Sequence, residues 1–157
     1  MNGANIVALF CDDVRSEVGN KLSLMGVYGQ DLLLQEFPAT LPKLCAVMLL
    51  DVPAGTEARE AVFVLKRGDE IVGRAVASVD EARRTRGAEP AVDPGARLSI
   101  RFIAQMSPLV FDAPCELIAY AEVMGEMVHG GRLKVAQLHD AATDAPFGRK
   151  GSTPTLV

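Results

Sequence analysis

The dominant pattern along the chain is a period-two alternation of apolar and polar residues, which places successive side chains on opposite faces of a β-strand. It is clearest over 97–106, where Leu98, Ile100 and Phe102 alternate with mostly polar residues. This spacing predicts a half-buried strand. Further strands are expected where alternation or a high content of Val, Ile, Leu and Phe recurs between turn residues, at 21–26, 60–66, 71–79, 116–123 and 132–138.

Two other segments, 6–11 and 44–50, are apolar at consecutive positions. Such segments suit central strands that are covered on both faces by a loop, a second layer or another subunit. No amphipathic helix of ordinary length is visible, although 80–86 has the local propensity for a short helical turn. About eight strands therefore predict an all-β, single-domain, antiparallel two-layer β-sandwich of the immunoglobulin-like type, in preference to a closed barrel.

Turn residues divide these strands. Gly68-Asp69 and Gly125-Glu126 predict hairpin turns, and Gly130-Gly131 predicts a bulge or a further turn. Two prolines within 37–42 indicate a rigid crossover between sheets. The polar segment 80–95 is expected to be a long mobile loop. A domain over 1–140 followed by a flexible C-terminal tail, 141–157, is the simplest organisation.

Composition narrows the classes of function. The 157 residues carry 16 Lys and Arg against 20 Asp and Glu, a net charge of -4, so no nucleic-acid partner is expected. The longest apolar run, Leu44–Leu50, is too short for a membrane span, and no secretion signal is evident, which predicts a cytoplasmic protein without a membrane partner. The three cysteines, Cys11, Cys45 and Cys115, form no Cys-x-x-Cys pair and are expected to be buried hydrophobic residues.

No set of residues indicates a catalytic centre, a metal site or a cofactor. Asp12 and Asp13 are adjacent, but neighbours on a strand point to opposite faces and cannot share a proton or a metal ion. His129 and His139 have no carboxylate at a recognisable ligand spacing and are expected on the surface. We therefore predict no catalytic, cofactor-binding or metal-binding residues.

The segment that contains the acidic pair has a second feature. Val18-Gly19-Asn20-Lys21 forms a tight connection between two strands, because Gly and Asn adopt left-handed dihedrals readily. Asp12, Asp13, Arg15, Asn20 and Lys21 are accordingly the candidate site residues. They serve either as a structural turn, with the two aspartates anchoring backbone amides, Arg15 or Lys21, or as a surface that binds a partner; the residues alone leave both open.

The same segment carries a resemblance. The run from Cys11-Asp12-Asp13-Val14-Arg15 to Asn20-Lys21-Leu22-Ser23-Leu24-Met25-Gly26-Val27-Tyr28, with Phe37-Pro38 and Leu41-Pro42-Lys43-Leu44 after it, resembles an uncharacterised family of small bacterial and phage proteins. The match is densest over the first fifty residues and continues as a pattern of strands to about Leu138. It implies a bacterial or prophage setting and a sandwich fold, and it carries over no catalytic residue.

These observations favour a non-enzymatic module that self-associates, as a homo-oligomer, or binds another protein through a sheet face or edge. One alternative is a minor structural component of a phage or phage-like particle, where the protein would be associated with the virion. Another is a small-ligand-binding protein or an enzyme with a pocket near the acidic turn.

Overall fold

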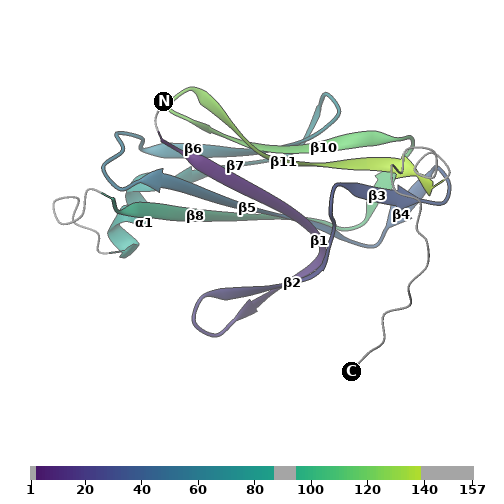
Figure 1. The fold of residues 1–157 in the computed structure, drawn as a ribbon, viewed down its shortest axis with the longest axis horizontal. Coiled ribbons are helices and arrows are strands. Elements are labelled where there is room, and N and C mark those ends of the chain that lie inside the picture. The colour runs from purple at the N-terminus through teal and green to yellow at the C-terminus, as the bar shows by residue number, and fades with distance from the viewer. Residues whose placement is uncertain (1–2, 87–94, 139–157) are drawn as a thin grey trace, which may run out of the picture.

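Eleven β-strands and one short helix make up residues 3–86 and 95–138, the parts of the chain that the computed structural model describes (Figure 1). The strands are β1 (Asn5–Glu17), β2 (Lys21–Val27), β3 (Asp31–Leu34), β4 (Ala39–Leu41), β5 (Leu44–Pro53), β6 (Glu60–Arg67), β7 (Glu70–Ser78), β8 (Arg97–Met106), β9 (Leu109–Phe111), β10 (Cys115–Val123) and β11 (Glu126–Gln137). The helix is α1 (Val79–Arg86). The fold is therefore all-β, as the alternating pattern predicts.

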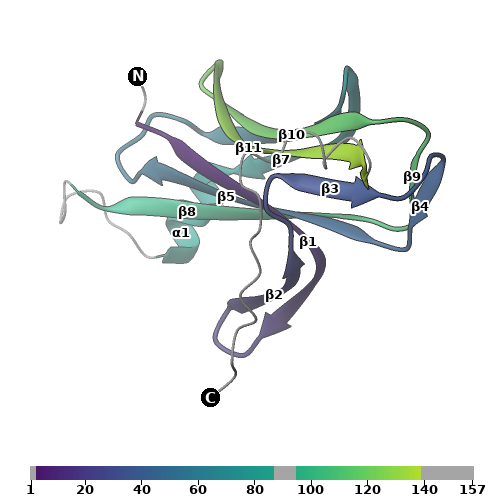
Figure 2. The same ribbon diagram turned by 45° about the vertical axis from the view of Figure 1, so that its right-hand side comes forward.

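The strands form two main sheets that lie one above the other (Figures 1 and 2). One has the order β2-β1-β5-β8 and the other the order β3-β11-β10-β6-β7. A two-stranded ribbon, β4-β9, lies at one end of the layers (Figure 2). The chain crosses between the sheets repeatedly, while the three hairpins β1-β2, β6-β7 and β10-β11 each stay within one sheet. The inner faces of both sheets supply one core.

That core is apolar throughout. Its largest fully buried side chains come from both layers and include Phe63 and Leu117 of one sheet and Leu50 and Leu98 of the other. None of the described polar or charged residues is buried. Each large aliphatic or aromatic side chain removed from water contributes about 1.5–3 kcal/mol, so burial between the two sheets is the main stabilising term.

Much of the predicted local structure is confirmed. The predicted strand 97–106 has the bounds of β8, and the seven other predicted strands each overlap one observed strand. Gly68 and Gly125 have positive φ values of 58° and 77° at the hairpin turns. The register of β10 and β11 shifts between Ala119 and Tyr120, which leaves Gly130 as the extra residue of a β-bulge. The doubly apolar segments 6–11 and 44–50 lie in the central strands β1 and β5.

Two parts of the fold prediction are wrong in detail. The described chain has eleven strands instead of about eight, because β3, β4 and β9 are only three or four residues long and too short to show a periodicity. The sheets are also not entirely antiparallel, since β3 pairs in parallel with β11. Such a pairing joins segments about a hundred residues apart and leaves no local signal in the sequence.

The expectation of a long mobile loop over 80–95 is also wrong for its first part. Residues Val79–Arg86 form α1. The Ser78 hydroxyl caps its N-terminus by accepting a hydrogen bond of 3.1 Å from the Glu81 amide. Val79 is completely buried. The remainder of that predicted loop, 87–94, and the predicted tail, 141–157, lie outside the described residues.

Candidate functional site

The strand β1 changes partner halfway along its length. From Asn5 to Cys11 it pairs with β5, and from Asp13 to Glu17 it pairs only with β2. The second half of β1, the turn at 18–20 and β2 therefore leave the sheet as a two-stranded hairpin, which we call the arm (residues 12–27). The arm bends away from the two layers and runs back beneath them (Figure 1). All five candidate site residues lie on it.

Asp12 and Tyr28 join the two strands at the root of the arm. The Tyr28 hydroxyl donates a hydrogen bond of 2.5 Å to Oδ1 of Asp12. Burial, followed by this carboxylate, raises the pKa of Tyr28 to about 12. Gly26 makes the approach possible, because a Cβ there would lie 2.1 Å from Oδ2 of Asp12. Gly26 also has a positive φ of 65°, so both its conformation and its surroundings require glycine.

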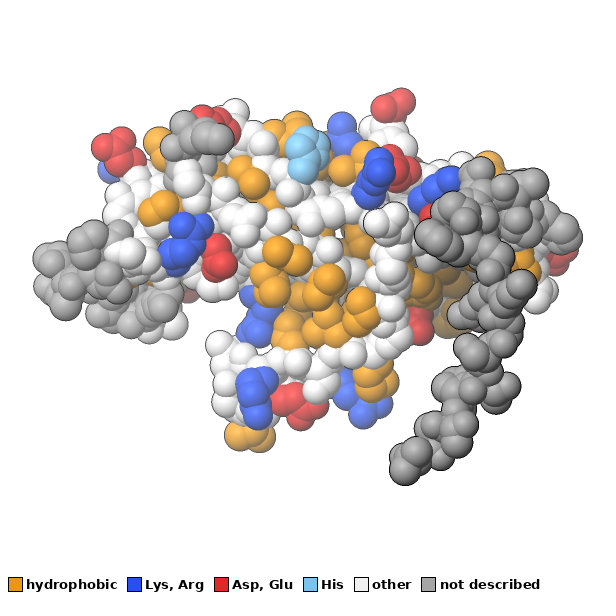
Figure 3. All heavy atoms as spheres, viewed as in Figure 1, with side chains coloured by type: hydrophobic (Ala, Val, Ile, Leu, Met, Phe, Trp, Pro, Cys, Tyr) orange, Lys and Arg blue, Asp and Glu red, His pale blue; other side chains and the backbone are white. Residues whose placement is uncertain are grey.

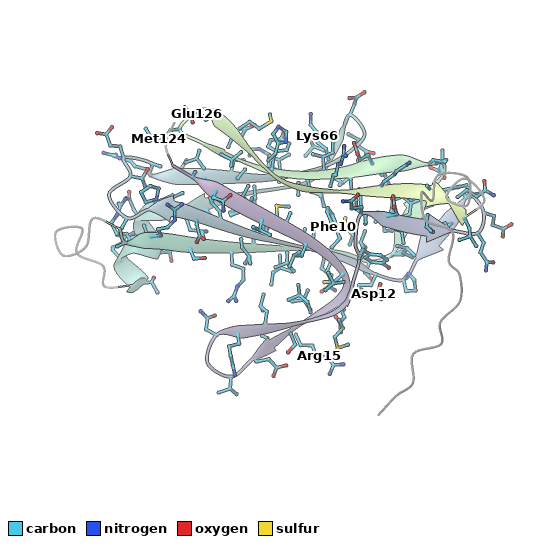
Figure 4. All side chains as sticks on the ribbon, in the orientation of Figure 1. Phe10, Asp12, Arg15, Lys66, Met124 and Glu126 are labelled. Atoms are coloured by element: carbon cyan, nitrogen blue, oxygen red, sulfur yellow. The ribbon has the colours of Figure 1, made fainter. Side chains whose placement is uncertain are left out.

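Asp13 faces the other way and binds different partners. Its carboxylate accepts hydrogen bonds from the Lys43 ammonium and from the Val14 amide, and it lies 3.7 Å from the Arg15 guanidinium. The Lys43 hydrogen bond holds the pKa of Asp13 below its ordinary value, and the same bond raises the pKa of Lys43. Arg15 itself points away from the body of the protein (Figure 4). The acidic pair therefore makes two separate anchors.

The tip of the arm is tied to β8. Asn20 has a positive φ of 58°, and its side-chain and backbone oxygens accept hydrogen bonds of 2.6 Å and 3.3 Å from the Arg101 guanidinium. Lys21 lies opposite Glu17 in the register of the hairpin. The structure thus distributes the five candidate residues along the arm instead of gathering them into one pocket. It brings Asp13 next to Arg15 and leaves Asn20 and Lys21 at the far end.

The arm covers a second, smaller apolar cluster that sequence reasoning missed. Cys11, Cys45 and Val47 are at most 1% exposed on the outer face of the β2-β1-β5-β8 sheet. The side of the arm that faces the sheet packs against them through Val14, Leu22 and Leu24, and Ile103 of β8 completes the cluster. The expectation of buried, free cysteines is confirmed for Cys11 and Cys45, whereas Cys115 is only partly buried.

Beyond the arm, the same outer face remains apolar but open. Val7, Leu9 and Leu49 are 45%, 37% and 36% exposed, respectively, and we call them the outer patch. Val7 and Leu49 are direct cross-strand neighbours. The side chains of this region form a continuous hydrophobic area beside the arm (Figure 3). The sequence predicts that 6–11 is covered on both faces, but the described residues cover the outer face of this strand only in part.

A wide depression lies where the edges of β7 and β8 approach each other. Leu49 and Asn20 lie at its margin, and its walls carry polar groups from α1 and β8, including Glu81, Thr85 and Arg101. Neither Asp12 nor Asp13 lines this depression. Its position connects the tip of the arm with the outer patch and with the helix.

One of the two histidines lies within the described residues. His129 lies on β11 beside Tyr120, with ring centroids 6.2 Å apart. His139 lies outside residues 3–86 and 95–138. Across those two ranges, no three His, Cys, Asp or Glu side chains are grouped so as to hold a metal ion.

A model of a family of unknown function (DUF6941) matches residues 6–136, which include the arm, both sheets and the outer patch. The chain belongs to this family. No curated protein matches it. Membership of DUF6941 confirms the resemblance to an uncharacterised family. In the described part of the chain, no helix combines the length and the hydropathy that a membrane span requires.

Proposed function

We propose that this member of DUF6941 is a non-enzymatic binding module that associates with a second copy of its own chain through the outer patch. The observation that carries the proposal is the exposure of Val7, Leu9 and Leu49 side by side on one sheet face. In a monomer with one solvated sheet face, these alternate positions would be polar. Contiguous exposed apolar surface of this kind marks interaction sites.

The surroundings of the outer patch favour a second copy over an unrelated partner. Leu49 lies between residues of opposite charge, with Asp51 two residues along the same strand and Arg101 directly opposite on β8. In a two-fold interface each residue meets the partner's surface in both directions, so a patch bordered by both signs can match itself. Among the described strands β2 pairs only with β1, so the outer edge of β2 adds a further surface that a strand of a second copy can pair with.

We also infer that the two layers form an immunoglobulin-like sandwich. The orders β1-β5-β8 and β11-β10-β6-β7 correspond to the A-B-E and G-F-C-C′ arrangements of that fold. The arm is then an insertion after the first strand. A bacterial or prophage setting and a virion-associated role stay predictions that start from the resemblance. A cytoplasmic location and the alternative of a small-ligand site near the acidic turn stay predictions from the residues alone.

The self-association proposal is tested by native mass spectrometry and light scattering over a range of protein concentrations. We expect a dimer that dissociates on dilution, and Leu9→Glu should shift the population to monomer, because the patch would then carry a charge that must be desolvated. The matched control is Met127→Glu. Met127 is 53% exposed on the other sheet, and this variant should still dimerise.

A wild-type protein that is monomeric at every concentration contradicts the proposal. Equal loss of dimer in both variants contradicts the choice of surface. Thermal melts of the two variants establish that each is folded before its oligomeric state is compared.

A further inference from the structure

Cys11 and Cys45 are distant in the sequence but lie directly opposite each other on β1 and β5. Both point to the outer face of the sheet, belong to the cluster beneath the arm and have 0% exposure. Cys11 is also the last residue of β1 that pairs with β5, since the arm begins at the next position. The two thiols therefore lie at the root of the arm.

The register brings these cysteines within the range of a disulfide bond. Residues directly opposite each other on antiparallel strands have Cα atoms about 4.5–5.5 Å apart, and disulfide-bonded cysteines have Cα atoms about 4.4–6.8 Å apart. The two sulfur atoms also lie near adjacent peptide carbonyls, Cys11 Sγ at 3.4 Å from the Asp13 oxygen and Cys45 Sγ at 3.9 Å from the Asp12 oxygen. Both thiols thus converge on the same short stretch of backbone.

We propose that Cys11 and Cys45 form a reversible disulfide that ties the root of the arm to β5. With a low-molecular-weight disulfide such as glutathione disulfide as oxidant, the thiolate of one cysteine attacks a glutathione sulfur and releases one glutathione thiolate. The thiolate of the other cysteine then attacks the protein sulfur of the mixed disulfide and releases the second. Two protein thiols are oxidised, and one glutathione disulfide is reduced to two glutathione molecules.

The arm controls this reaction because it covers both thiols. Burial is the main factor that raises the pKa of Cys11 to about 11, and it also raises the pKa of Cys45, so little reactive thiolate exists while the arm is closed. The hydrogen bonds between Asn20 and Arg101 hold the tip of the arm down. Oxidation therefore requires the arm to open, and a looser tip speeds it. This inference is independent of the proposed self-association.

The test is treatment of the purified full chain with excess glutathione disulfide, followed by intact-mass measurement and peptide mapping without reduction. We expect the loss of two hydrogen atoms, a peptide that links Cys11 to Cys45, and full reversal by a thiol reductant. The oxidised protein should melt about 5–15 °C higher than the reduced protein, because the new bond restricts the unfolded chain. Cys115→Ser is the matched control and should form the same bond.

A second variant tests the role of the arm. Asn20→Gly removes the side-chain acceptor of Arg101 and retains a residue that adopts the φ of 58°. It should accelerate oxidation at least about threefold with little change in melting temperature. Three results would overturn the proposal. They are a stable mixed disulfide between glutathione and either cysteine, a disulfide that involves Cys115, and no oxidation of Asn20→Gly. An unchanged rate of oxidation in Asn20→Gly would show that closure of the arm does not limit the reaction.

Discussion

Single residues set the geometry of the arm. The period-two pattern predicts that Asp12 and Asp13 point to opposite faces, and the structure confirms this, since Asp12 binds Tyr28 while Asp13 binds Lys43. Their partners could not be predicted. Tyr28 lies sixteen positions from Asp12 and Lys43 lies thirty from Asp13, so only the path of the chain decides that they meet. Gly26 is visible in the sequence as a glycine within a predicted strand, but its contact with Asp12 depends on the same path of the chain.

The ionisation of Tyr28 provides a direct measure of this anchor. The chain has two tyrosines and no tryptophan, so Tyr120→Phe leaves Tyr28 as the one phenol in an ultraviolet titration. We expect a midpoint near pH 12 in place of the ordinary 10. Because the pKa is raised on folding, the neutral phenol stabilises the protein fully below pH 10, and this contribution is lost as the pH rises through 12.

Asp12→Asn in the same background separates the two causes of the shift. The midpoint should fall, because the carboxylate is gone, and remain above 10, because burial is the larger cause. A midpoint at the ordinary value in the parent protein would show that the root of the arm is open in solution.

At the scale of elements, close approach and capping explain what periodicity alone does not. The bulge at Gly130 and Gly131 lets β11 lie against β1, because the space for a Cβ is occupied at both positions by Ile6 or Ala8. The two glycines predict a bulge or a further turn from sequence, and the tertiary structure decides both for the bulge and for the strand beneath it. The start of the helix α1 is also marked in the sequence, since Ser78 and Glu81 form the Ser-x-x-Glu pattern of a capping box.

Gly131→Ala tests the contact between the layers. The added Cβ would lie 2.9 Å from the backbone oxygen of Ala8, which cannot move without disturbing β1. We expect the free energy of unfolding in denaturant to fall by about 1–3 kcal/mol. Gly55→Ala is the control, because nothing lies within 4 Å of a Cβ at that position, and it should change stability little. Equal losses of stability in Gly131→Ala and Gly55→Ala would mean that β11 and β1 do not approach each other closely at Gly131.

Arg83→Ala tests whether α1 is part of the folded body. The Arg83 guanidinium donates to the backbone oxygens of Ala54 and Thr56 at 3.3 Å and 2.9 Å and to Asp80 at 2.7 Å. Loss of these bonds should lower the free energy of unfolding by about 1–2 kcal/mol, whereas Arg84→Ala on the same helix should be nearly neutral. If Arg83→Ala leaves the free energy of unfolding unchanged, α1 is not held to the body of the protein by these bonds and the segment is mobile, as the sequence predicts.

At the scale of the molecule, one shared core holds the two sheets together and the arm adds a small second one. Period two identified the apolar face of β8, of which Leu98 and Ile100 are buried. Phe102 is only partly buried and stacks on Phe63, with ring centroids 5.4 Å apart. Phe63 is the residue of this pair that is completely enclosed. Its environment combines strands from both layers.

Phe63→Ala should therefore cost about 3–5 kcal/mol in the free energy of unfolding, because it removes a large buried side chain and leaves a cavity. Chemical denaturation followed by circular dichroism measures the change. Val76→Ala, at a position 52% exposed on β7, should stay within about 0.5 kcal/mol of wild type. A loss below about 1 kcal/mol for Phe63→Ala would place Phe63 outside the core.

The sequence alone determined the all-β class, the eight longer strands, two hairpin turns and the separation of Asp12 from Asp13, because each depends on neighbouring residues and on the alternation of side chains along a strand. The tertiary structure alone decided the parallel pairing of β3 with β11, the closure of the arm over β5, the meeting of Cys11 with Cys45 and the openness of the outer patch. These features join residues that are far apart in the chain. The free energy that selects them comes from burial between layers, which no local pattern encodes.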